Sequence, residues 1–370
     1  MIYLDNGATT LHKPPQVIQA VINALQTCGN PGRGGHTASM NAAKTVYRCR
    51  ELAAKMFDCS EEQVVFTSSC THGLNIAISS LVKPGDTVVV SGFEHNAVMR
   101  PLHALGAKIC VAGRKLFDPE DTLKKFEKAI KNGTKVAIFT HISNVFGYVL
   151  PVEKMAEICK KYAVPFIIDA AQSAGNLDIS LRKTGAAFIA MPGHKGLLGP
   201  MGTGILLCAH TPSPLIYGGT GSVSASYEMP PDLPDLLEAG TLNIPGIAGL
   251  CAGLRYLCSE GVDTIFRREQ KEAKRCAEGL QKMGLKVFSG EDQGGTVSFL
   301  PPGDCEEFAL LLAQKGIAVR AGLHCAPLAH ESAGTLHTGT VRLSFGHNAK
   351  SWQTEQFLRV IPGCFSKKYF

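Results

Sequence analysis

The sequence predicts an α/β protein with a mostly parallel sheet covered by helices on both faces, followed by a smaller C-terminal α+β domain. Its 370 residues exceed the roughly 250–300 at which a single hydrophobic core stops growing, so we expect two domains. Apolar residues make up 45% of the chain and charged residues 18%, which is typical of a soluble globular protein. Short apolar runs alternate with helical patterns up to about residue 210, as parallel strands buried on both faces require.

The large domain begins with a helical pattern that places Val17, Val21 and Leu25 on one face. The apolar runs that we interpret as strands lie at 64–66, 87–90, 135–139, 165–169, 187–190 and 204–207. In such a sheet, ligands bind outside the carboxyl ends of the strands. We therefore expect the functional site at that edge.

Residues 217–245 are rich in Gly, Ser and Pro, which indicates a long functional loop leading to a domain junction. After it, we expect helices at 246–259, 262–283, 304–315 and 351–360, and strands at 286–289, 296–300, 317–320 and 340–345. The predicted division is an N-terminal segment, 1–15, that packs with the small domain, a large domain, 16–245, and the small domain, 246–370.

Charge and composition exclude several classes of protein. A net charge of +6 without a basic stripe argues against nucleic-acid binding, and no apolar run approaches the roughly 20 residues of a membrane span. The chain shows no signal peptide, and its 13 cysteines have no C-x-x-C spacing, so we expect reduced thiols and a cytoplasmic protein. The 12 histidines show no H-x-x-x-H pair, so we expect no metal site.

Two charged residues follow apolar strands. Lys195 lies in Gly193-His194-Lys195-Gly196, just after the strand that ends at Ala190; a lone lysine there is usually a solvated charge. Asp169 ends the run Phe166-Ile167-Ile168, where a carboxylate needs hydrogen bonds or a cationic partner such as a protonated pyridine nitrogen. The alternative for Asp169 is a helix N-cap.

The segment Ser68-Ser69-Cys70-Thr71-His72-Gly73 lies between a strand and a helix. Its hydroxyls and the free amides of the helix start could bind a phosphate, although a simple Ser or Thr cap has the same pattern.

Four segments together resemble a known family. Residues 3–10, 140–147, 169–173 and 193–195 are similar to the signature blocks of class V, fold-type I pyridoxal 5′-phosphate (PLP) enzymes, specifically the cysteine desulfurase and selenocysteine lyase group. The resemblance extends over essentially the whole chain. It implies a seven-stranded sheet of the PLP-transferase type, with PLP as cofactor.

The resemblance assigns cofactor contacts residue by residue. Lys195 would carry PLP as a Schiff base, Asp169 would pair with the pyridine nitrogen, and Gln172 would bind the phenolic oxygen. His95 would stack on the ring and move protons. The implied phosphate contacts are Thr71, His194 and, across the interface of a homodimer, Thr241, and Cys70 is a further cofactor contact. The family usually has a serine phosphate ligand where this chain has Pro192.

The resemblance also implies substrate contacts. Arg342 matches the clamp on the substrate carboxylate, which a planar guanidinium can grip bidentately, and a surface salt bridge is the alternative. Asn144 matches a polar contact to the bound substrate, and His36 and Arg320 are further substrate contacts.

Cys325 lies in residues 318–327, which resemble the segment carrying the nucleophilic cysteine of the group. His324 and Arg320 would favour its thiolate, the reactive form. The implied reaction converts L-cysteine to L-alanine and leaves a persulfide on Cys325 for a sulfur-acceptor protein. Leu323 replaces a histidine that is common in the family.

Three other functions remain open. The chain could be a selenocysteine lyase or another class V β-eliminating enzyme, as Leu323 and Pro192 suggest. A non-catalytic sulfur-transfer protein is disfavoured by the intact Lys195, Asp169 and His95. An NAD-binding domain is disfavoured because residues 199–204 do not form G-x-G-x-x-G before a helix.

Overall fold

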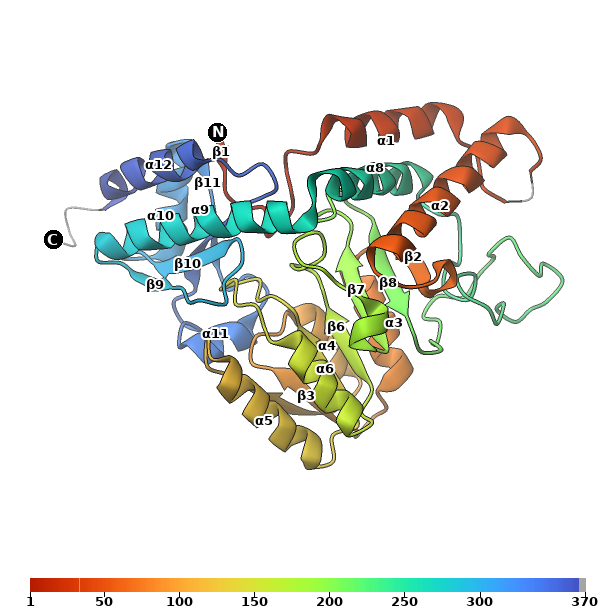
Figure 1. The fold of residues 1–370 in the computed structure, drawn as a ribbon, viewed down its shortest axis with the longest axis horizontal. Helices are drawn as coiled ribbons and strands as arrows, with labels where there is room; N and C mark the ends of the chain where they lie inside the picture. Colours follow the sequence, from red (N-terminus) through yellow and green to blue (C-terminus); the bar gives the residue numbers. More distant parts are fainter. Residues whose placement is uncertain (33, 366–370) are drawn as a thin grey trace.

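The computed structural model describes residues 1–32 and 34–365. Figure 1 shows a large lobe built around a twisted sheet and a smaller lobe formed by the C-terminal elements. The chain passes from one lobe to the other through two consecutive helices, α8 (Ile244–Glu260) and α9 (Val262–Lys282). The N-terminus lies on the side of the small lobe (Figure 1).

The large lobe contains a seven-stranded sheet. Its order is β2 (Val64–Thr67), β8 (Gly204–Cys208), β7 (Phe188–Pro192), β6 (Phe166–Asp169), β5 (Val136–Thr140), β3 (Thr87–Ser91) and β4 (Lys108–Ala112). The neighbours from β7 to β4 pair in parallel, whereas β8 pairs antiparallel with both β7 and β2. The predicted mostly parallel α/β fold is confirmed.

Strand β4 was not predicted from the sequence. It lies at the edge of the sheet and begins with the exposed Lys108, and Ile109 and Val111 are only half-buried. Its residues 109–112 are all apolar, but the strand is less buried than β2 at the opposite edge, whose four residues are all buried.

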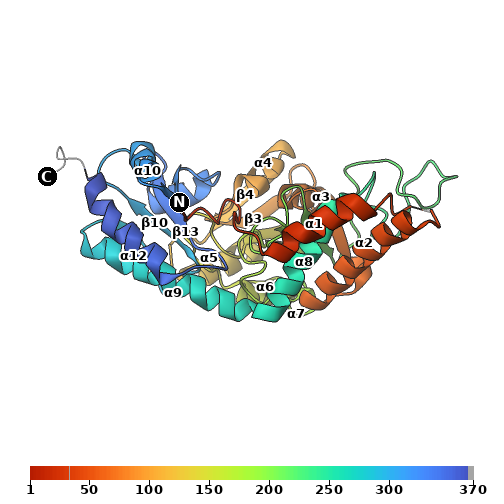
Figure 2. The ribbon, with the colours of Figure 1, turned by 90° about the horizontal axis from the view of Figure 1, so that it is seen from above.

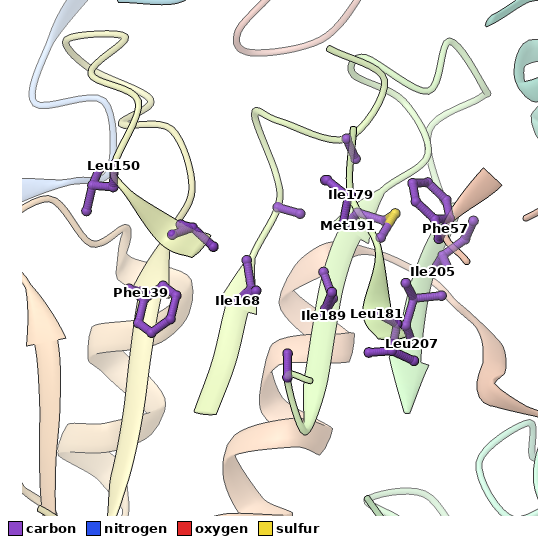
Figure 3. Packing of buried hydrophobic residues seen from close by; sticks show 14 of the residues in the cluster. Phe57, Phe139, Leu150, Ile168, Ile179, Leu181, Ile189, Met191, Ile205 and Leu207 are labelled. Atoms are coloured by element: carbon purple, nitrogen blue, oxygen red, sulfur yellow. The ribbon is translucent and has the colours of Figure 1, made fainter. Parts of the chain in front are cut away.

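Helices cover both faces of this sheet, as expected. They are α1 (Pro15–Thr27), α2 (Thr37–Met56), α3 (Cys70–Leu81), α4 (Asn96–Ala104), α5 (Pro119–Lys131), α6 (Val152–Lys161), α7 (Leu181–Thr184) and α8. Successive strand residues enter different cores: Ile167 packs with residues of α3 and α4, and Ile168 packs with residues of α5 and α6. Figure 3 shows the second core, with Phe139, Ile168 and Ile189 on adjacent strands.

The small lobe has an antiparallel sheet in the order β12 (Arg320–Gly322), β13 (Thr340–Ser344), β10 (Thr296–Leu300) and β9 (Lys286–Phe288). Its other helices are α10 (Cys305–Gln314), α11 (Pro327–Ala333) and α12 (Ser351–Val360). Helix α9 runs beside α12 in both views (Figures 1 and 2).

The strand predicted at 317–320 divides at Val319. Its first part, β11 (Ile317–Ala318), pairs in parallel with β1 (Ile2–Tyr3), and its second part is β12. The N-terminal strand thus lies against the small lobe. Residues 211–243 contain neither a helix nor a strand, in agreement with the predicted long loop. Within the described residues, none of the helices is long and apolar enough to cross a membrane.

Candidate active site

A cavity of about 100 Å³ opens at the carboxyl ends of the central strands. Asp169, Thr140 and Pro192 are the last residues of β6, β5 and β7, and all three line it. Eight predicted site residues meet here: Cys70, Thr71, His95, Asn144, Asp169, Gln172, His194 and Lys195. The topology therefore brings together segments that are widely separated in the sequence.

Asp169 and Lys195 provide the charged groups of this cavity. Oδ1 of Asp169 accepts hydrogen bonds from the Ala171 N–H at 2.8 Å and from the Cys70 thiol at 3.6 Å. Burial raises the pKa of Asp169, whereas the Ala171 hydrogen bond and the Lys195 charge oppose the rise. Burial lowers the pKa of Lys195, which increases its neutral amine fraction. Asp169 is a buried carboxylate suited to a cationic partner.

The start of α3 forms one wall of the cavity. Ser69 is the N-cap and accepts a hydrogen bond from the His72 N–H at 3.1 Å, while Cys70 and Thr71 are the first two helical residues. The first amides of a helix have no intrahelical partner and attract anions. Pro192 also lines the cavity but supplies no hydroxyl.

His95 is the N-cap of α4 and lies in the same cavity. Its Nδ1 accepts a hydrogen bond from the Ala97 N–H at 3.0 Å, so Nε2 carries the proton of the neutral ring. Burial, and then the charge of Lys195, lower the pKa of His95 to about 4. The neutral form is therefore maintained at physiological pH.

The N-terminal segment packs against two residues that line the cavity, Gln172 and His194. Nε2 of Gln172 donates to the carbonyl oxygen of Gly7 at 3.0 Å, and Nδ1 of His194 lies 3.1 Å from the Thr9 hydroxyl. The His194 carbonyl oxygen also accepts a hydrogen bond from Lys13 at 2.9 Å. These contacts hold the Lys195 turn against the chain's first residues.

Arg342 lies on β13 and is buried, with its guanidinium directed toward the N-terminal segment. One terminal nitrogen is 2.5 Å from Oδ1 of Asp5, and the other donates to the main-chain oxygen of Asn144 at 3.0 Å. Its Nε is a buried donor without a partner among the described residues. Arg342 is thus oriented by two contacts and keeps donors for a further anion.

Cys325 is exposed in a turn between β12 and α11. The Asn96 N–H donates to the Cys325 carbonyl oxygen at 2.8 Å, and Nδ2 of Asn144 donates to the His324 carbonyl oxygen at 2.8 Å. Asn144 lines the cavity, and Asn96 directly follows His95, which also lines it. These bonds attach the cysteine turn to the rim of the cavity.

The side chain of His324 does not have the expected role beside the thiol. It is buried, and burial together with the charge of Arg342 lowers its pKa to about 2. The neutral ring cannot supply the positive charge that was expected next to Cys325. Arg320 is exposed on β12 and pairs in register with Arg342 on β13.

Cys325, Arg320 and Arg342 are not among the residues that line this cavity within the described chain, and neither are His36 and Thr241. Both are exposed: His36 caps α2 by accepting from the Ser39 N–H at 3.3 Å, and Thr241 lies in the loop before α8. Their contacts to substrate and to a neighbouring subunit's phosphate stay predictions.

Three residues near the site were not predicted from the sequence: Asp5, His330 and Thr335. Asp5 belongs to the block 3–10, but its pairing with Arg342 follows from the docking of β1 on the small lobe. His330 and Thr335 contact His324 or one another and belong to no recognised motif.

Known proteins share this sequence and fold. The aminotransferase class-V family matches residues 2–357. A "Probable cysteine desulfurase" of Pyrococcus abyssi is 33% identical over 98% of this chain and 93% of that protein. A "Cysteine desulfurase" of Haloferax volcanii is 30% identical over 93% of this chain and 85% of that protein. The apo structure of a cysteine desulfurase from Thermococcus onnurineus superimposes with a TM-score of 0.90 at 33% identity, covering 98% of this chain and 94% of that one. The chain therefore belongs to the aminotransferase class-V family.

Proposed function

We propose that this protein is a PLP-dependent cysteine desulfurase that converts L-cysteine to L-alanine and receives the sulfur as a persulfide on Cys325. The observation that carries the proposal is the single cavity that contains Lys195, Asp169 and His95, with the Cys325 turn bonded to its rim. The names of the relatives, matched over nearly the whole chain, support the same activity.

The cavity residues suit PLP. The buried carboxylate of Asp169 would hold the protonated pyridine nitrogen, and the start of α3 with Thr71 and His194 would hold the phosphate. Gln172 has a second amide hydrogen for the phenolic oxygen. Lys195 would hold the aldehyde carbon. When bound, PLP withdraws electrons from the substrate Cα and so makes its proton removable.

The chain's own residues then have separate tasks. The neutral amine of Lys195 would take the Cα proton, and the remaining donors of Arg342 would hold the substrate carboxylate. The Cys325 thiolate would form an S–S bond to the substrate sulfur while the Cβ–S bond breaks, leaving the persulfide. His95, with its proton on Nε2, would exchange a proton at this stage.

The proposal includes partners and location. Cys325 is exposed, so a sulfur-acceptor protein could reach its persulfide. A homodimer would bring a second chain's Thr241 to the phosphate. It would also cover exposed apolar residues of α1 and α2, namely Ile18, Ile22, Leu25, Met40 and Tyr47. We place the protein in the cytoplasm.

A selenocysteine lyase is the second candidate. Leu323 stands where the family commonly has a histidine, and the ring of His324 lies against His330, so neither residue supplies a charged imidazole to the sulfur. Selenide leaves more readily than sulfide and depends less on such help.

The decisive experiment incubates the PLP-loaded protein with L-cysteine, quantifies L-alanine and maps the persulfide by mass spectrometry. Cys325→Ala should abolish both alanine and persulfide formation from L-cysteine, whereas Cys258→Ala, which removes another exposed thiol, should change neither. Persistent desulfuration by Cys325→Ala would refute the proposed nucleophile. Parallel assays with selenocysteine and cysteine sulfinate decide the substrate class.

A further inference from the structure

The turn that presents Cys325 has an unfavourable backbone. The Ala326 N–H donates to the Leu323 carbonyl oxygen at 2.9 Å, and the two central residues, His324 and Cys325, have φ angles of 51° and 56°. Two consecutive positive φ values are typical of type I′ turns, in which Gly and Asn are favoured. Side chains other than these are strained there, so the surrounding structure must hold the turn in place.

A buried chain of hydrogen bonds starts at the side chain of His324. Its Nε2 lies 3.3 Å from the Arg320 carbonyl oxygen, and its Nδ1 lies 3.4 Å from Nε2 of His330. Nδ1 of His330 in turn lies 2.8 Å from the Thr335 hydroxyl. His330 and Thr335 are fully buried, and the two imidazole rings are parallel to within 11°.

The carbonyl at one end determines the direction of every bond in this chain. A carbonyl oxygen only accepts, so Nε2 of His324 carries the proton and its Nδ1 is an acceptor. His330 must then donate from Nε2, and the Thr335 hydroxyl must donate to its Nδ1. Burial lowers the pKa of both imidazoles, to about 2 for His324 and about 4 for His330, in agreement with two neutral rings.

We propose that His330 is a positioning residue for the cysteine nucleophile: by donating to His324 it holds the left-handed turn that presents Cys325 at the rim of the Lys195 cavity. The inference rests on the proposed function of Cys325. Neither His330 nor Thr335 lines the cavity, so both act through His324 and not on the substrate.

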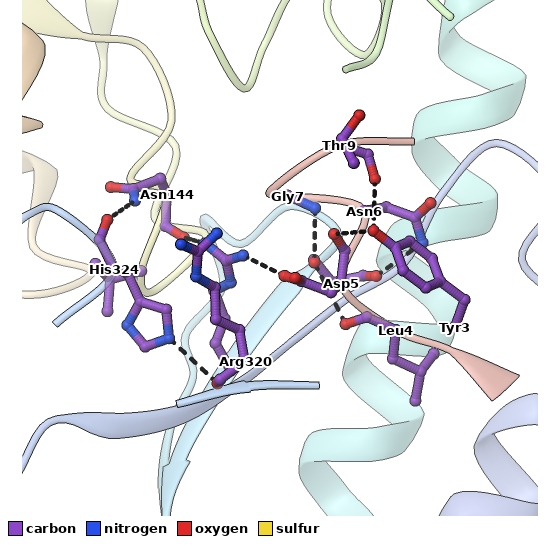
Figure 4. Close-up of polar contacts among 12 residues, drawn as sticks. Tyr3, Leu4, Asp5, Asn6, Gly7, Thr9, Asn144, Arg320 and His324 are labelled. Atoms are coloured by element: carbon purple, nitrogen blue, oxygen red, sulfur yellow. Dashed lines mark hydrogen bonds and ion pairs between the residues drawn. The ribbon is translucent and has the colours of Figure 1, made fainter. Parts of the chain in front are cut away.

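Asn144 links the same turn to Arg342. Its side chain donates to the His324 carbonyl oxygen (Figure 4). Its main-chain oxygen accepts a hydrogen bond from Arg342 at 3.0 Å. His324 is therefore held at its carbonyl by the wall of the cavity and at its ring by His330. Loss of the His330 contact leaves the ring with its bond to the Arg320 carbonyl oxygen alone, so it should displace Cys325 without disturbing Lys195.

The test compares four variants of the PLP-loaded enzyme. His330→Phe keeps an aromatic ring beside Phe146 but removes the donor, and His330→Gln keeps an amide donor. Thr335→Val removes the hydroxyl at nearly constant volume. His337→Phe, at an exposed histidine of the same α11–β13 connection, is the control. For each variant we would measure alanine release, Cys325 persulfide, cofactor absorbance and exchange of the substrate Cα proton in deuterated water.

Cα-proton exchange depends on Lys195 and not on Cys325, so it separates a displaced nucleophile from a damaged site. In His330→Phe we expect kcat for alanine and persulfide formation to fall about tenfold to a hundredfold, with unchanged KM, absorbance and exchange. The kcat of His330→Gln should be close to that of the unaltered enzyme, and the kcat of Thr335→Val should fall about threefold. His337→Phe should match the unaltered enzyme.

The inference is overturned if folded His330→Phe retains its kcat, or if exchange falls in parallel with persulfide formation. Thermal melting establishes folding; if His330→Phe does not fold, an unchanged kcat in Thr335→Val overturns it instead. Desulfuration by Cys325→Ala would overturn the proposed function whatever the His330 variants do.

Discussion

The carboxylate of Asp5 lies 2.5 Å from the guanidinium of Arg342, although the two residues are 337 positions apart in the sequence. The side chain of Arg342 is 2% exposed and that of Asp5 20%, so the pair is largely removed from water. Asp5 balances a buried cation before any substrate binds, and it orients the group that we expect to hold the substrate carboxylate.

Asp5→Asn should leave the Arg342 charge without compensation. Because breaking a buried ion pair strands the remaining charge, we expect the free energy of unfolding to fall by about 2 kcal/mol. Urea denaturation measures this change, and Asp178→Asn, at a highly exposed carboxylate, is the control. Equal stability of the two variants would mean that Asp5 does not compensate Arg342.

Asp169→Asn tests the electrostatics of the cofactor site. The amide keeps the size and can still accept from the Ala171 N–H, but it loses the charge that would keep a pyridine nitrogen protonated. We expect alanine formation to fall by about two to three orders of magnitude, the usual cost of losing one preorganised electrostatic contact. Full activity with normal cofactor absorbance would contradict this role.

Pro192→Ser tests the departure at the end of β7. Pro192 lines the cavity, and a serine would supply a hydroxyl to the expected phosphate. A hydrogen bond to a charged group contributes about 1.5 kcal/mol, so the affinity for PLP should increase about tenfold. Titration of the apoprotein with PLP, followed by absorbance, measures this affinity. An unchanged affinity would mean that the phosphate does not lie beside residue 192.

Glu269→Gln should change how stability depends on pH. Glu269 is buried beside a second cavity of about 30 Å³, and burial raises its pKa to about 8. Between about pH 5 and 8 the unfolded chain loses this proton and the folded chain keeps it, so stability falls as pH rises. The free energy of unfolding of Glu269→Gln, relative to that of the wild type, should therefore rise by about 3 kcal/mol between pH 5 and pH 8. Urea denaturation at both pH values measures this difference, and Glu278→Gln, at an exposed position of the same helix, is the control. If Glu269→Gln and wild type change their stability with pH to the same extent, the prediction is wrong.

Gly175→Ala should disturb the turn that carries Lys195. Gly175 has a φ of 87°, and an added Cβ would lie 2.3 Å from the Gly196 carbonyl oxygen. We expect a loss of about 3 kcal/mol of stability together with reduced cofactor binding. The control is Gly106→Ala. Gly106 also has a positive φ, 68°, but an added Cβ there would meet open space, so we expect a loss of only about 1 kcal/mol of stability. Similar thermal melting of both variants would show that the contact with Gly196 is unimportant.

The sequence by itself determined the central sheet, because strands buried on both faces must be continuously apolar. It also determined that Lys195 and Asp169 lie at the carboxyl ends of such strands, where parallel topology brings ligand-binding residues together. The edge strand β4 was missed although residues 109–112 form a short apolar run, and its partial exposure follows from its place at the edge of the sheet.

Only the tertiary structure decided the partners of the charged and strained groups. Arg342 meets Asp5 because β1 pairs with β11 across almost the whole chain length, and His324 turns to His330 because α11 folds back over the cysteine turn. Local residue patterns record whether a position is buried, but the hydrogen-bond partner of a buried side chain is set by how the elements pack, whether it lies 337 positions away, as for Arg342, or six, as for His324. The neutral state of His324, unlike its position beside Cys325, is therefore a property of the fold, since burial and the Arg342 charge together disfavour the doubly protonated, positively charged ring.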